Sequence, residues 1–187
     1  WSRAHRDKAM DEIDPVVKGG FKLTPDMKIA TAGSCFAQHI ARHLQEQGYN
    51  YFVTEEAHPV ISDTVARQFG YGVFSARYGN IYTVRQLLQL AQRAYGEISP
   101  IEDVWEVEGG FIDPFRPNVQ PMPFGTMEEF RAERETHFAA VRQIIETTDV
   151  FVFTFGLTEA WVSAEDGSVF PLAPGVAGGS FDPARHV

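Results

Sequence analysis

The sequence predicts an α/β domain in which helices cover a parallel sheet. Strand, helix and strand patterns follow one another between Met27 and Thr54, which is typical of a βαβ unit. The run 149–155, Asp-Val-Phe-Val-Phe-Thr-Phe, is apolar almost without a break, as expected of a strand buried on both faces. With 187 residues, 44% of them hydrophobic, the chain has material for one core and no linker that divides it. We therefore expect an α/β domain over residues 28–187, preceded by an N-terminal extension over residues 1–27.

The first strand and helix are predicted from a short apolar run that ends in glycine. Met27–Gly33 is the strand, and the residues from Cys35 to Gln47 follow with helical periodicity. The residues that we expect to face the core are Phe36, Ile40 and Leu44. Gly48 stands where a C-cap glycine belongs, and a second strand is predicted over 49–54.

A glycine- and aromatic-rich loop over 69–80 leads to the next predicted helix. Thr83 is a credible N-cap for a helix over 84–95, since its hydroxyl can accept a hydrogen bond from a free backbone N–H. We expect this helix to bury Leu87, Leu88 and Ala91. The stretch 103–123 alternates and is broken by glycines and prolines, which predicts a hairpin insertion.

The third helix is predicted from a capping-box spacing. Thr126 and Glu129 have that spacing, and the helix that they open runs over 127–147. Its expected inward residues are Phe130, Phe138, Val141, Ile144 and Ile145.

Composition and charge exclude several classes of partner and site. A formal net charge of −9 argues against nucleic acid and against an anionic membrane surface, because both need a concentrated cationic face. A single cysteine excludes a disulfide framework and a multi-thiolate zinc site, and we expect no metal and no cofactor. The sequence contains no run of about 18 apolar residues, which is the length that a helix needs to span a bilayer. The start at Trp1 has neither an initiator methionine nor an apolar leader, so we expect a piece of a longer protein, located in the cytoplasm.

The segment Gly33-Ser34-Cys35 is the first candidate for chemistry. It lies where a strand turns into a helix, so its backbone N–H groups and the positive end of the helix dipole can stabilise a thiolate or an oxyanion. The strand's carboxyl end is also where open α/β sheets place their ligands. The alternative is that Cys35 is a small packing residue and the Gly-Ser pair only a turn.

Two further element ends could serve the same site. Gly79 and Asn80 precede a helix, and the glycine amide can donate to a developing anion. Gly156, Thr158 and Glu159 follow the most apolar strand. The carboxyl ends of parallel strands meet at one edge of a sheet, so we expect these residues near Cys35.

These three segments resemble the GSCFA family, which is named after the signature that stands here as Gly33-Ser-Cys-Phe-Ala37. The segments 74–82 and 154–161 are similar to that family's recurrent blocks, and the resemblance runs from Phe21 to Phe181. It implies a place among the SGNH, or GDSL-like, hydrolases, which have a flavodoxin-like three-layer fold and cleave or transfer acyl groups. The implied function is ester hydrolysis or acyl transfer through an acyl-enzyme, without a specified substrate.

Carried over to this sequence, the resemblance leaves two registers for the nucleophile. Cys35 is favoured by the length of the strand before Gly33, and a shift by one residue makes it Ser34 instead. Gly79 would donate its N–H to the oxyanion. Gly156, Thr158 and Glu159 would replace the superfamily's Gly-x-Asn-Asp block. Thr158 there offers a hydroxyl in place of an amide, and Glu159 would orient its neighbours.

The superfamily's general base is the histidine of an Asp-x-x-His block, which this sequence lacks in that form. Asp182 and His186 have one residue too many between them, so we expect them to be a decoy and the base to lie beyond Val187. A carbohydrate ester is the expected substrate, with Tyr78, Tyr82 and Trp161 lining the cleft. The alternative function is a glycan- or protein-binding module without turnover, and the oligomeric state is left open.

Overall fold

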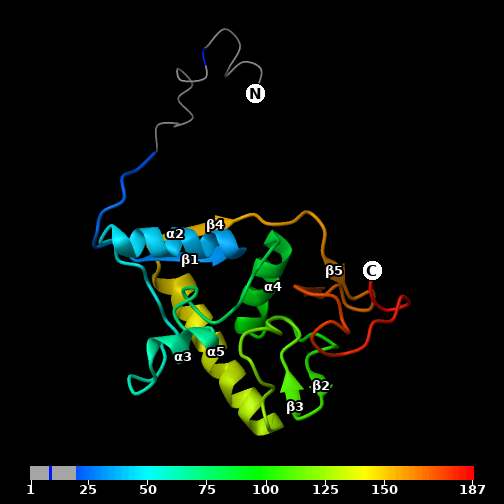
Figure 1. Cartoon of the computed structure of the whole chain (residues 1–187). Helices are drawn as coiled ribbons and strands as arrows, with labels where there is room; N and C mark the ends of the chain where they lie inside the picture. Colours follow the sequence, from blue (N-terminus) through cyan, green and yellow to red (C-terminus); the bar gives the residue numbers. More distant parts are fainter. Residues whose placement is uncertain (1–8, 10–19) are drawn as a thin grey trace.

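The computed structural model describes Ala9 and residues 20–187 (Figure 1). Most of the expected N-terminal extension, residues 1–8 and 10–19, lies outside the described residues. No helix in the described part of the chain is long and apolar enough to cross a membrane.

The centre of the fold is a short parallel strand pair. β1 (Ile29–Gly33) pairs with β4 (Val150–Thr154) in a register that joins Ile29 to Val150 and Gly33 to Thr154. On the other edge of β1, the strand predicted over 49–54 is reduced to one parallel bridge between Ile29 and Tyr51. It ends there because the Thr54 N–H turns away from β1 and donates to the carbonyl of Ser75 at 2.8 Å.

Helices lie on both sides of this pair. α2 (Cys35–Glu46) runs along β1 and β4, and its Ala41 and Leu44 pack with Ile29 in one buried cluster (Figure 1). On the other side Ala30 and Ala32 belong to a second cluster with Ala140, Val141 and Ile144 of α5 (Met127–Thr147). The described residues therefore form an α/β fold with a small parallel sheet, as predicted in class.

The predicted inward faces of the helices are partly wrong. In α2 the buried residues are Ala37, Ala41 and Leu44, whereas Phe36 is 69% exposed. The small alanines allow α2 to lie close against the sheet, and the bulky Phe36 has no place there. Leu88 and Ile145 were also expected to face inward and are exposed, whereas Leu87 and Ile144 pack inward as predicted.

The remaining elements sit around this core. α4 (Val84–Ala94) begins at Thr83 with the full capping box formed with Gln86, as predicted for its N-cap. The hairpin expected within 103–123 is confirmed as β2 (Trp105–Val107) paired with β3 (Gly110–Ile112). The elements that the sequence did not indicate are α3 (Asp63–Gln68) and the antiparallel pair β5 (Trp161–Val162) and β6 (Val169–Phe170).

α5 has the predicted bounds but only half of the predicted capping box. Thr126 accepts a hydrogen bond from the backbone N–H of Glu129, as expected. The Glu129 carboxylate, however, accepts from the backbone N–H of Gly125 at 3.0 Å rather than from that of Thr126.

β4 is more exposed than its composition predicted. Phe151 is 40% exposed and Phe155, just after the strand, is 79% exposed, so burial on both faces is wrong for this strand. The reason is that β4 pairs only with β1 among the described residues, which leaves its outer edge uncovered.

Candidate functional site

The site begins at the turn from β1 into α2, which only glycine can make. Gly33 has φ +137°, and a Cβ at this residue would lie 2.2 Å from Oγ1 and 2.6 Å from the carbonyl oxygen of Thr154. The Thr154 hydroxyl accepts a hydrogen bond from the backbone N–H of Ser34 at 3.2 Å. Sequence reasoning missed Thr154, although the end of β4 is where a parallel partner of Gly33 must lie. Thr154 therefore fixes the first residue of the turn.

Ser34 and Cys35 differ sharply in their surroundings. Ser34 is the N-cap of α2 and is 6% exposed, and its Oγ is buried with no partner among the described residues. Cys35 is the first residue of α2 and is exposed as a free thiol. Its backbone N–H has no acceptor in residues 20–187, as expected in a first helical turn. The accessible nucleophile is thus the thiol, at the positive end of a 12-residue helix.

The second predicted segment reaches this turn through the backbone. The Ile81 N–H donates to the carbonyl of Gly33 at 2.9 Å, which brings Gly79 and Asn80 to the end of β1. Gly79 has φ +68°, and its N–H makes no hydrogen bond with any described residue. That free donor is what an oxyanion would need.

The third segment also converges on the turn. The Gly156 N–H donates to the carbonyl of Tyr82 at 3.1 Å. A Cβ on Gly156 would lie 3.1 Å from the Tyr82 ring and 3.3 Å from the Cβ of Ser34, so glycine allows the two neighbours to approach. The end of β4 therefore touches both of the other segments.

Thr158 and Glu159 continue past this contact and are both exposed. Glu159 lines a cleft of about 370 Å³ together with Tyr82 and Trp161, which we call the aromatic cleft. Thr158 does not line it. Of the aromatic residues expected in a sugar-binding cleft, Tyr78 does not belong there, because it is 4% exposed and its hydroxyl donates to the carbonyl of Thr31.

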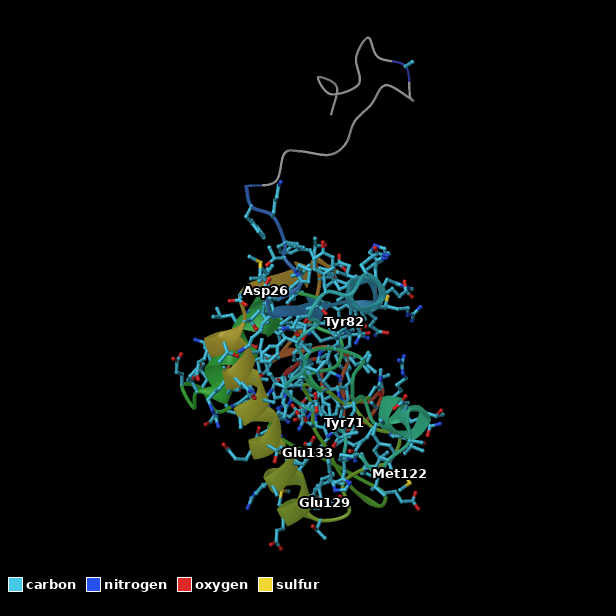
Figure 2. The ribbon with its side chains drawn as sticks, turned by 90° about the vertical axis from the view of Figure 1, so that its left-hand side faces the viewer. Asp26, Tyr71, Tyr82, Met122, Glu129 and Glu133 are labelled. Carbon is cyan, nitrogen blue, oxygen red and sulfur yellow. The ribbon has the colours of Figure 1, made fainter. Side chains whose placement is uncertain are left out.

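A second cleft adjoins the aromatic cleft. It has a volume of about 200 Å³ and is lined by Gly79, Asn80, Gln38 and Arg116 among others, and we call it the Gly79 cleft. Tyr82 and Pro171 line both clefts and so form the wall between them. In Figure 2, Tyr82 lies at the level of the sheet.

Arg116, which lines the Gly79 cleft, belongs to a set of buried and half-buried charged residues, which we call the ion cluster. Its members are Glu55, Arg77, Arg93, Asp113, Arg116, Glu133 and Arg134. Glu133, which Figure 2 shows on α5, contacts both Arg77 and Arg116. Burial would raise the pKa of Asp113, but the nearby guanidinium groups of Arg116 and Arg93 hold it well below its usual range. Burial also lowers the pKa of Arg93 to about 10.

Two buried histidines are held by carboxylates. His186 Nδ1 accepts from the backbone N–H of Asp182 at 3.1 Å, and its Nε2 lies 2.9 Å from a carboxylate oxygen of Glu102. Both ring nitrogens are therefore occupied, and the Asp182 side chain is not paired with the ring in the manner of a catalytic dyad. His137 Nδ1 lies 2.8 Å from the carboxylate of Glu55, while its Nε2 is buried without a partner in the described chain.

The environment of His137 disfavours the charged form of its ring. Burial and the charge of Arg116 lower the pKa of His137, and its bond to Glu55 opposes them without reversing the shift. Neither Ser34 nor Cys35 has a histidine or carboxylate bonded to its side chain in residues 20–187. Within those residues no group of three or more His, Cys, Asp or Glu side chains is arranged to hold a metal ion.

Comparison with known proteins finds a family match. The model of the GSCFA family matches residues 28–185, which is most of the chain. Neither the curated proteins nor the solved structures contain a match to this chain.

Proposed function

This chain belongs to the GSCFA family, and from that premise we propose that it hydrolyses or transfers an acyl group through an acyl-enzyme formed at Cys35. We place it with the SGNH hydrolases and regard the β1–β4 pair as the start of a flavodoxin-like three-layer sandwich. The observation that carries the proposal is the convergence at the β1–α2 turn. Ile81 bonds to Gly33, and Gly156 lies against Ser34.

In the proposed reaction the Cys35 thiolate attacks the acyl carbon of an ester. The new S–C bond forms as the carbonyl becomes an oxyanion. Collapse of the oxyanion breaks the ester C–O bond, and the leaving alkoxide takes up the proton that the thiol had lost and departs as the alcohol. Water, or an acceptor alcohol, then attacks the thioester and frees the thiol. The backbone N–H groups of Gly79 and Cys35 have no acceptor among residues 20–187 and would stabilise the oxyanion.

The two clefts suggest where the substrate lies. Tyr82 and Trp161 line the aromatic cleft and could stack on the apolar face of a sugar ring. Glu159 at the same cleft could accept hydrogen bonds from sugar hydroxyl groups. An acylated carbohydrate is therefore our proposed substrate.

The two buried histidines are not available as the general base in this proposal. His186 is bonded at both ring nitrogens and His137 is buried against Glu55, so neither can take a proton from Cys35. Ser34 is the alternative nucleophile, but its buried Oγ would first have to turn toward the cleft.

The test is to incubate the protein with short-chain nitrophenyl esters and to measure both turnover and intact mass. We expect turnover and an added acyl mass that maps to Cys35, both lost in Cys35→Ala. The matched variant Ser34→Ala removes the neighbouring hydroxyl and should retain the adduct. If neither substitution reduces turnover, the proposed reaction is wrong.

A second candidate function is a glycan-binding module without turnover. The observation in its favour is that neither candidate nucleophile has a base bonded to it in the described chain. Calorimetric titration with acetylated and unmodified oligosaccharides separates the two functions. Binding that survives Cys35→Ala, together with absence of any acyl adduct in the native protein, would favour the module.

A further inference from the structure

We propose that a small chamber next to the Gly79 cleft holds an ordered water molecule, and that this water ties Asn80 to the Glu55–His137 pair. The chamber, which we call the Asn80 chamber, has a volume of about 30 Å³. Asn80, Arg93, His137 and Tyr78 are among its lining residues. That volume is enough for a water molecule and too small for a metabolite.

Three polar atoms of the chamber's lining residues lack partners among the described residues. They are Asn80 Oδ1, Arg93 Nη2 and His137 Nε2, and all three are buried. Arg93 Nη2 lies 3.7 Å from Asp113 Oδ1, which is beyond hydrogen-bond distance. Buried polar groups in folded proteins are nearly always hydrogen-bonded, either to protein or to ordered water. Three orphans around one small chamber therefore indicate a shared partner.

The hydrogen-bonding roles of these atoms fit water. The Glu55 carboxylate can only accept, so His137 Nδ1 carries the proton that it donates to Glu55, and Nε2 of the neutral ring is an acceptor. Asn80 Oδ1 is a second acceptor and Arg93 Nη2 is a donor. One water can donate to the two acceptors and accept from the guanidinium group.

Ions do not fit the same chamber. A cation would face the positive charge of Arg93, and Arg116 also lines the chamber. An anion would face the lone pairs of His137 Nε2 and Asn80 Oδ1. Only a small neutral molecule that both donates and accepts satisfies all three atoms.

The water would give Asn80 a fixed orientation, and this consequence rests on the proposed function. Asn80 lines both the chamber and the Gly79 cleft. With Oδ1 bonded inside the chamber, the other end of the amide, Nδ2, is turned toward the cleft beside the free N–H of Gly79. His137 is then a positioning residue for a second oxyanion donor.

The water itself is tested without any assay of activity. A high-resolution crystal structure of the protein should show one water within hydrogen-bond distance of Asn80 Oδ1, Arg93 Nη2 and His137 Nε2. Long-range proton–nitrogen NMR of protein labelled at histidine should show His137 with the proton on Nδ1. In Asn80→Leu, whose larger apolar side chain displaces the water, the Nε2 signal should move to the position of an unbonded nitrogen. An empty chamber, a proton on Nε2, or no movement of the signal would overturn the proposal.

The positioning role is tested by a double-mutant cycle on ester turnover. We expect Asn80→Ala and His137→Gln each to lower kcat by roughly tenfold with little change in KM. In the Asn80→Ala background, His137→Gln should cause no further loss, because His137 acts through Asn80. Equal losses in both backgrounds would overturn the positioning role. The control is His43→Gln, whose side chain is 72% exposed on α2.

Failure of the proposed function and failure of the water proposal can be distinguished. If the native protein turns over no ester, the proposed function is wrong, and the crystal and NMR measurements still decide whether the water is present. Circular dichroism shows whether His137→Gln is folded. If it is not, the same two measurements on the native protein decide the proposal.

Discussion

The substitution Gly33→Ala should be far more damaging than the loss of one hydrogen atom suggests. The backbone of Gly33, at φ +137°, is one that L side chains rarely adopt, which costs about 1–3 kcal/mol. The added Cβ would also lie 2.6 Å from the carbonyl oxygen and 2.9 Å from the backbone nitrogen of Thr154, which strand pairing holds in place. Rotation of the Thr154 hydroxyl could relieve its own 2.2 Å contact, but it would break the bond from Ser34 N, worth about 1 kcal/mol. We expect a loss of about 3–6 kcal/mol in the free energy of unfolding.

Urea unfolding followed by tryptophan fluorescence measures this loss, and Gly48→Ala is the matched control. Gly48 has φ +75°, yet nothing lies within 4 Å of the position of its Cβ. Gly48→Ala therefore tests backbone strain alone, at about 1–2 kcal/mol. Thr154→Ala in the Gly33→Ala background should recover only the share of the loss that is due to the hydroxyl. If the two glycine variants are destabilised to within about 1 kcal/mol of each other, close packing of β1 on β4 is not what requires Gly33.

Other features of the structure give shorter predictions. Cys35 should react with one equivalent of a thiol reagent in the native protein, because the only cysteine of the chain is exposed; a thiol that reacts only after denaturation would contradict this. Thr83→Ala should lower the free energy of unfolding by about 1 kcal/mol through loss of the N-cap, and Thr83→Ser should restore most of it. Burial lowers the pKa of His137, so as the pH falls the unfolded chain protonates this imidazole at a higher pH than the folded chain does. The free energy of unfolding should therefore fall as the pH drops below 6.5, and His137→Gln should flatten this slope in urea titrations. Glu133→Gln should cost about 3 kcal/mol because it removes the carboxylate charge that both Arg77 and Arg116 contact, whereas the exposed Glu135→Gln should cost almost nothing.

The elements of the fold that could be predicted are those with strong local signals. Thr83 and Thr126 mark helix starts because their hydroxyl groups accept hydrogen bonds from backbone N–H groups of the same first turn. Such a contact joins residues that are close in sequence, so a local pattern predicts it. Which face of a helix turns inward was harder to predict, because it depends on partners distant in sequence. Phe36 was expected in the core because it is hydrophobic, but the face of α2 that packs inward is formed by Ala37, Ala41 and Leu44.

The outline of the candidate site could be predicted from the sequence, but its details depend on contacts between residues that are distant in the chain. The Gly33 turn and Gly156 lie at the carboxyl ends of the paired strands β1 and β4, and the Ile81–Gly33 hydrogen bond brings Gly79 to them from an irregular segment. The contribution of Thr154 depends on the register of β1 with β4, which no local pattern fixes. The orphaned Nε2 of His137 depends on a contact with Glu55 across 82 positions of the chain.

The ion cluster explains how an irregular segment can support a site that needs fixed donors. Residues 74–78 are buried although they have no regular secondary structure, so their polar backbone groups need partners from elsewhere. Arg77 N donates to the Glu55 carboxylate at 2.8 Å, and the Arg77 side chain binds Glu133 of α5. Side chains here replace the ladder of hydrogen bonds that a neighbouring strand would supply. Because Gly79 and Asn80 follow this segment directly, Glu55 and Glu133 should control the geometry of the proposed oxyanion donors, although both lie outside the three segments that form the candidate site.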